Sequence, residues 1–169
     1  MKTRYLLALV LSAAMASSYG QQAPSWQKWK WLMGAWAGEG NGQPGKGSGN
    51  FSFATDLENK ILVRKANSQY PAQGNRPASV HDDLLIIYAD ISGSPSKAIY
   101  FDNEGHVINY SVTYPGESIV FQSEKLGNMP VFRLTYSAVD DQTINTKFEM
   151  SQDGAVFMTY VEGKSRKVK

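Results

Sequence analysis

The chain of 169 residues contains no cysteine. It therefore has no disulfide, no thiolate metal site, no iron–sulfur cluster, no cysteine nucleophile and no lipid anchor on cysteine. It also has little excess charge. Two of its 17 Lys and Arg residues are Lys2 and Arg4, and the other 15 balance the 15 Asp and Glu residues. This near-neutrality excludes the broad positive surface of a nucleic-acid binder, so we expect no nucleic-acid partner.

The sequence also lacks an apolar run of the roughly 20 residues that span a bilayer. Its longest run extends from Tyr5 to about Ala16, after two basic residues and before several small ones, which is the order of a signal peptide. We expect cleavage after Gly20, with cleavage after Ala16 as the alternative. The sequence thus predicts a periplasmic or secreted protein with no integral membrane segment and a single domain over residues 21–169.

The remaining pattern changes from a helical period to a strand period. Trp26, Trp29 and Met33 have the spacing of one helical face, which predicts a short helix over Ser25–Leu32. From Trp36 onward apolar residues recur at every second position, and turn residues divide the chain into about ten strands. Closing such a meander removes its exposed edges. We therefore predict an all-β, antiparallel up-and-down closed β-barrel of about ten strands with a short N-terminal helix.

Few residues offer catalytic chemistry. There are two histidines and no Gly-x-Ser-x-Gly sequence, so the residues needed for nucleophilic acyl transfer are missing. His106 is expected at the barrel rim or surface. In His81-Asp82-Asp83, neighbouring strand residues point to opposite faces, so we expect no metal site there. Six carboxylates are available for acid–base work, and their positions on polar strand faces or in turns predict that they are solvated: Asp56, Glu58, Asp102, Glu104, Glu149 and Glu162.

A glycine-rich stretch over residues 38–49 comes close to a phosphate-binding loop. The next predicted element is a strand, whereas the nucleotide motifs require the N-terminus of a helix. This stretch is therefore predicted to be a hairpin loop.

A Gly-x-Trp sequence opens the first predicted strand. Gly34 permits a tight turn out of the preceding helix, and Trp36 supplies a large plate that can seal one end of a small barrel. This arrangement resembles the lipocalin-like, or calycin, barrels. Together with residues 151–154 and 162–167 it is similar to a family of small exported bacterial domains of unknown function and, more distantly, to the nitrobindins. The resemblance implies that a basic residue near the end of the last strand packs across the tryptophan, and Arg166 is the positional match.

Nitrobindins hold a haem through a histidine on their last strand, inside the barrel. The corresponding stretch of this chain, residues 156–161, contains no histidine. The resemblance therefore carries no haem site over to this sequence, and we expect no cofactor.

The calycin resemblance implies an interior that binds a small, largely apolar molecule, as a carrier or sensor would. The sequence offers inward candidates for lining it at alternating strand positions: Tyr110, Val112, Phe132, Leu134, Tyr136 and Phe148. Side chains alone can also fill a small barrel. A structural or interaction protein of the cell envelope is thus the alternative, and an enzyme on a small apolar substrate or a haem-binding barrel is the lesser one. Because the sequence offers few catalytic residues, a protein without enzymatic activity is favoured over an enzyme.

Overall fold

The computed structural model describes residues 23–40, 49–72, 74–75 and 77–168. The expected signal peptide and residues 41–48 of the glycine-rich stretch lie outside the described residues. The elements are a 3-10 helix η1 (Gln27–Trp29) and strands β1 (Gly34–Gly38), β2 (Gly49–Asp56), β3 (Ile61–Tyr70), β4 (Ser79–Tyr88), β5 (Lys97–Asp102), β6 (Val107–Thr113), β7 (Ser118–Ser123), β8 (Val131–Asp140), β9 (Thr143–Ser151) and β10 (Met158–Lys167).

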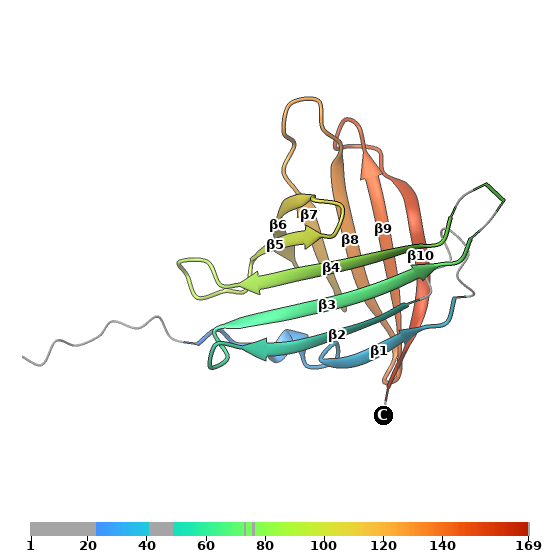
Figure 1. The fold of residues 1–169 in the computed structure, drawn as a ribbon. Coiled ribbons are helices and arrows are strands. Elements are labelled where there is room, and N and C mark those ends of the chain that lie inside the picture. The colour runs from blue at the N-terminus through green and yellow to red at the C-terminus, as the bar shows by residue number, and fades with distance from the viewer. Residues whose placement is uncertain (1–22, 41–48, 73, 76, 169) are drawn as a thin grey trace, which may run out of the picture.

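Each strand pairs with the strand before it, always antiparallel, and β1 also pairs with β10. The sheet of ten strands is therefore closed, which confirms the predicted barrel (Figure 1). Closure leaves no strand of the sheet at an edge, so no row of backbone N–H and C=O groups is offered to another chain. In Figure 1, β3 and β4 run across the view, while β8, β9 and β10 stand nearly upright behind them.

The predicted N-terminal helix is wrong in type and length. Among the described residues only η1 is helical, and its bonds follow the tighter i→i−3 pattern, as from the Trp29 N–H to the Trp26 carbonyl at 2.9 Å. No side chain caps its start, and Gly34, with φ of +107°, turns the chain directly into β1. No helix within the described ranges is long and apolar enough to cross a membrane.

The two ends of the barrel differ. At one end, here called the capped end, lie η1 and the β2–β3, β4–β5, β6–β7 and β8–β9 connections. The Trp26 indole N–H donates to the Asn59 carbonyl at 2.9 Å, and the Trp29 indole N–H donates to the Tyr114 hydroxyl at 3.1 Å, which fixes η1 across this end. The opposite end, here called the mouth, holds the β3–β4, β5–β6, β7–β8 and β9–β10 connections.

Aromatic rings fill the half of the interior next to the cap. Trp29 is fully buried, and its ring contacts Phe53, Tyr114 and Phe121 at centroid separations of 5.8 to 6.3 Å. Tyr136 packs edge-on against Phe53 at 5.4 Å. Rings of this size bury large apolar areas, and their edge-to-face contacts add further favourable free energy. This cluster is the core of the barrel.

Trp36 lies in the same core. It is almost fully buried, its indole N–H donates to the Leu32 carbonyl at 2.8 Å, and its ring stacks with Phe51. The basic group over its face is Lys167, whose ammonium lies 5.2 Å from the ring centroid. Arg166, expected in that place, instead pairs with Glu39. The register explains the difference, because Lys167 is directly opposite Trp36 and shares its face, whereas its neighbour points the other way.

Candidate functional site

A buried ion pair lies on the inner wall of the barrel, between the neighbouring strands β3 and β4. Arg64 on β3 stands opposite Phe53 and Leu85, both fully buried, so its side chain points into the barrel. It pairs with Asp83 on β4, and the two side chains are 11% and 7% exposed. The guanidinium also lies 6.0 Å from the ring of Tyr136, on β8. Arg64 thus places a positive charge inside the barrel, matched by one carboxylate.

A second carboxylate lies beside this pair. Asp102 is directly opposite Asp83 on β5, so both face inward, and its side chain is only 3% exposed. Burial raises the pKa of Asp83 above its ordinary value, against the opposing charge of Arg64. Burial also acts to raise the pKa of Asp102, but hydrogen bonds from the His106 backbone and side chain outweigh it and leave that pKa below its ordinary value. The two facing carboxyls therefore titrate in different ranges.

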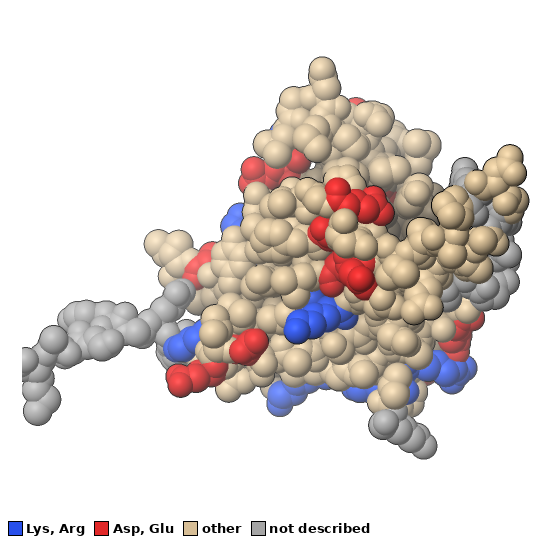
Figure 2. Space-filling view, viewed as in Figure 1, with Lys and Arg blue, Asp and Glu red and all other residues tan. Residues whose placement is uncertain are grey.

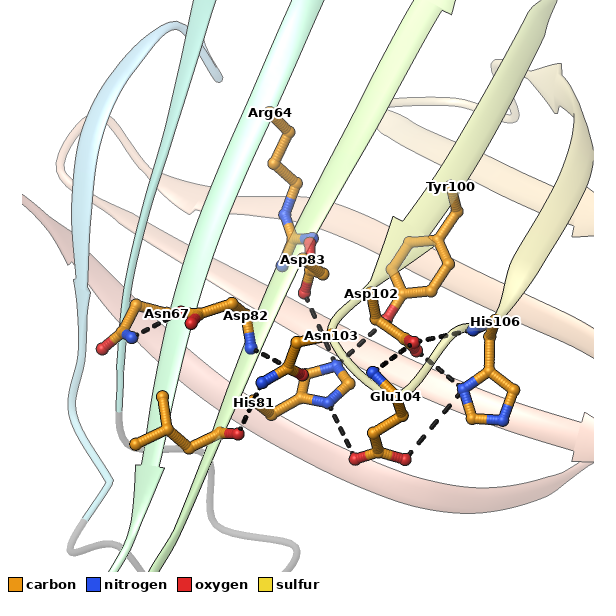
Figure 3. Close-up of polar contacts among 11 residues, drawn as sticks. Arg64, Asn67, His81, Asp82, Asp83, Tyr100, Asp102, Asn103, Glu104 and His106 are labelled. Atoms are coloured by element: carbon orange, nitrogen blue, oxygen red, sulfur yellow. Dashed lines mark hydrogen bonds and ion pairs between the residues drawn. The ribbon is translucent and has the colours of Figure 1, made fainter.

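Hydrogen bonds extend from Asp102 along the mouth (Figure 3). Its carboxylate accepts the Tyr100 hydroxyl at 3.2 Å and lies 2.8 Å from the imidazole Nδ1 of His106. The Tyr100 hydroxyl lies 3.0 Å from Nε2 of His81, whose Nδ1 is 3.2 Å from Glu104. These contacts tie the β5–β6 turn to β4. They form a polar wall on β4, β5 and the β5–β6 turn at the mouth.

Two expectations about charged residues are corrected here. Asp102 was expected to be solvated, yet it is buried because it shares the inward face of β5 with Tyr100. Glu149 is buried too, on the outer face, where Arg133 donates to it at 2.8 Å and Lys147 lies 3.2 Å away.

His106 lies at the rim with 59% of its side chain exposed, as predicted. Across the described residues, no three His, Asp or Glu side chains form a group that could hold a metal ion.

Three buried polar atoms facing the interior are without a hydrogen-bond partner among the described residues. They are Nε of Arg64, the hydroxyl of Tyr136 and the hydroxyl of Thr146. Tyr136 and Thr146 are directly opposite each other on β8 and β9, and the Arg64 guanidinium lies over the Tyr136 ring. A buried polar group without a partner costs roughly 1–3 kcal/mol. Three of them at one level of a barrel call for a ligand or ordered water.

Space lies on the strand next to Thr146. Gly163 on β10 is directly opposite Thr146, so a side chain at this position would point into the barrel. A Cβ built on Gly163 would meet no atom within 4 Å. The interior therefore has open space at Gly163, on the strand paired with Thr146.

The wall opposite the carboxylates is aromatic. Phe132 and Phe148 stack with centroids 5.9 Å apart, and Tyr160 packs edge-on against Phe148 at 6.3 Å. Tyr160 and Met158, at the start of β10, are 65% and 68% exposed. Solvent thus reaches this wall at the mouth, and the mouth half of the interior has one polar side and one apolar side.

The six residues predicted to line a ligand site divide between the two halves. Tyr110, Val112, Leu134 and Tyr136 are buried within the packed core, and Phe132 and Phe148 are only partly buried and lie toward the mouth. Gly34, Trp36 and Arg166 lie where β10 meets β1. Two of the six thus lie toward the mouth, and a third, Tyr136, carries one of the unpartnered hydroxyls.

Two hollows lie on the surface of the described residues, and one of them is bordered by Asp83 and Asp102. One, of about 550 Å³, is at the capped end and is lined by Lys28, Trp31 and Tyr114, among others. The other, of about 410 Å³, is shallow and lies over β3, β4 and β5, where Lys65, Leu84 and Phe101 border it. None of the six predicted ligand residues lines either hollow.

Sequence reasoning missed Arg64, Asp83 and Thr146. A signal for the first two was present, since Arg64 has the same strand parity as Leu62 and Asp83 has that of Leu85. A charged residue in phase with the buried positions of a strand points into the core. Such a residue is kept buried only when it is paired or has a ligand to bind.

The chain matches no protein-family model, and no curated protein matches it either. The site is therefore interpreted from its own geometry.

Proposed function

We propose that this chain is an exported carrier or sensor that binds a small, largely apolar molecule in the mouth half of its barrel. The observation that carries the proposal is the set of unpartnered buried atoms on Arg64, Tyr136 and Thr146. A folded protein rarely leaves buried polar groups unsatisfied, and the exceptions concentrate at functional sites. The resemblance of the Gly34–Trp36 motif to lipocalin-like barrels supports the same reading.

The surroundings of these atoms suit an apolar ligand with one polar end. Phe132, Phe148 and Tyr160 offer an apolar wall that solvent reaches, and Gly163 leaves room beside Thr146. Ligand sites of small proteins are mostly apolar with a few convergent polar groups. The proposed ligand enters at the mouth, lies against the aromatic wall and ends at the unpartnered atoms.

Export is proposed from the sequence of the N-terminus, where two basic residues precede the apolar run. N-terminal sequencing of the protein from its own source is expected to begin at Gln21. Cytosolic material that begins at Met1 would overturn export without affecting the ligand proposal.

The test of binding compares two substitutions at one position. Native mass spectrometry of wild-type protein purified from its own source is expected to show a bound mass, and titration with a medium-chain apolar probe such as decanamide is expected to shift Tm or tryptophan emission. Gly163→Leu fills the space beside Thr146 and should abolish these signals. Gly163→Ala, which adds a single methyl group, should keep them. If the wild-type protein shows neither a bound mass nor any shift, the carrier proposal is wrong. The alternative, a structural or interaction protein of the cell envelope, then takes its place.

A further inference from the structure

The charge of the interior limits what the ligand can carry. Arg64 already pairs with Asp83, so its positive charge is matched within the barrel. Asp102 faces inward next to Asp83, and it also holds its negative form, because its pKa lies below the ordinary value. The barrel wall that faces the proposed ligand therefore carries at least as many negative as positive charges. A further anion would add repulsion in a region of low dielectric constant.

The charges on the outer surface also disfavour an anionic ligand. Figure 2 shows acidic side chains near the centre of the face over β4 and β5, with a basic side chain beside them. Glu104 and Asp82 add their carboxylates at the mouth, where Glu104 lies 3.2 Å from His81 and Asp82 accepts a bond from Asn67 at 2.6 Å. A negative rim lowers the local concentration of anions and favours neutral or cationic molecules.

The unpartnered atoms specify the complementary group. Nε–H of Arg64 can only donate a hydrogen bond. Burial raises the pKa of Tyr136 to about 12, so its hydroxyl carries its proton at neutral pH and can donate. The Thr146 hydroxyl is a third available donor. An oxygen with two lone pairs and no formal charge can accept from two of these three donors without adding an anion.

We infer that the ligand carries an uncharged hydrogen-bond acceptor of the carbonyl class, an amide, ketone or ester, at the end that reaches Arg64, Tyr136 and Thr146. This inference rests on the proposed function. The apolar remainder of the ligand lies against Phe132 and Phe148. A carboxylate, the other common polar end of an apolar molecule, is selected against by Asp83 and Asp102.

A series with one chain length and three polar ends tests the inference. Decanamide, decanoic acid and decane are titrated at pH 7, and affinity is measured by calorimetry together with the shift in Tm. Decanamide is expected to bind about tenfold or more tightly than either decanoate or decane, which corresponds to about 1.4 kcal/mol. Decanoate that binds as tightly as decanamide overturns the inference.

A pair of Tyr→Phe variants locates the acceptor. Tyr136→Phe removes one donor and is expected to weaken decanamide binding about three- to tenfold while leaving decane binding unchanged. The control is Tyr114→Phe at the capped end, where the hydroxyl already accepts from Trp29 and donates to the Pro95 carbonyl. It should change the affinity for none of the three molecules. Equal losses for decanamide and decane in Tyr136→Phe would overturn the inference.

The failures of the two proposals are distinct. If none of the three molecules binds or shifts Tm in the wild-type protein, the interior binds no apolar chain and the proposed function fails together with this inference. If the molecules bind but decanoate matches decanamide, only the assignment of the polar end fails. Gly163→Leu should abolish binding of every molecule in the series, which shows that the series reports on the interior.

Discussion

The capped half of the barrel interior is aromatic and its indole N–H groups are hydrogen-bonded, whereas charges and unpartnered polar atoms lie at its inner boundary and in the mouth half. At the cap, the indole N–H groups of Trp26, Trp29 and Trp36 each donate to a defined acceptor. At the boundary with the mouth half, the hydroxyl of Tyr136 and Nε of Arg64 lie buried with no partner among the described residues. The two halves share one sheet, so the difference lies in their side chains and not in the backbone.

This contrast separates stability from binding. Large buried rings supply most of the favourable free energy of a small core. Buried charges and unpartnered donors contribute little or cost free energy, and proteins retain them where a ligand must be held. We therefore expect substitutions in the capped half to act on folding. Substitutions among the unpartnered atoms should act mainly on binding.

Loss of a ring from the capped half should have the largest effect. Trp36→Ala removes a buried indole and its bond to Leu32, and it is expected to cost on the order of 3–5 kcal/mol. Tyr160→Ala removes an exposed ring at the mouth and should cost less than about 1 kcal/mol. Urea unfolding of both variants measures the difference. A Trp36→Ala variant as stable as the wild type would remove the distinction between the halves.

Breaking the buried ion pair should have the next largest effect. Asp83→Asn leaves Arg64 buried without its carboxylate and is expected to cost about 3 kcal/mol. Replacing both members, as Arg64→Met with Asp83→Leu, removes the uncompensated charge and should recover most of that loss. A double-mutant cycle in urea gives the coupling free energy. A double variant that is no more stable than the single one would contradict a paired role for the two residues.

The architecture could be predicted from the sequence because strand faces alternate regularly. Tyr110 and Val112 on β6 and Leu134 on β8 lie on the inward face, as their period of two indicates. The polar site could not be predicted by the same rule, because assigning polar residues to the outside places Asp102 in solvent. Which residues meet across a closed barrel depends on strand register, and Arg64 and Tyr136 are far apart in the chain.

The prediction of an N-terminal helix was wrong because it, too, depended on contacts between distant parts of the chain. The spacing of Trp26, Trp29 and Met33 suits one face of a helix. Two of these side chains, however, find their partners at Asn59 and Tyr114, on separate connections of the cap. Packing of each indole into its own place at the cap outweighs the local preference for a longer helix.

The carboxylate at the mouth should give a smaller, pH-dependent effect. Asp102 accepts the backbone N–H groups of Glu104 and His106 at 3.0 and 2.9 Å, so Asp102→Asn is expected to cost roughly 1–2 kcal/mol at pH 7. Because its pKa is lowered on folding, the unfolded chain binds this proton more readily than the folded protein. Its contribution is present above about pH 4 and is lost as the pH falls through the lowered pKa.

The measurement is the difference in Tm between Asp102→Asn and the wild type across pH. That difference should be constant near neutrality and shrink below about pH 4. Asp141→Asn, in the exposed β8–β9 turn, is the control and should show a small difference at every pH. A gap for Asp102→Asn that widens at low pH would mean that the folded state raises this pKa.

The smallest expected effect concerns the space at the mouth. Gly163 needs no special backbone conformation, and its Cβ would meet no atom within 4 Å. Gly163→Ala is therefore expected to stabilise the protein by about 0.5 kcal/mol, because alanine loses less conformational freedom on folding than glycine. Gly49→Ala is the matched change in a tight place, since its Cβ would lie 2.4 Å from the Asn67 carbonyl oxygen, and it should be clearly destabilising. If thermal unfolding shows that Gly163→Ala also destabilises, the space beside Thr146 is already filled. The mouth half would then be packed like the capped half, with no room for a ligand.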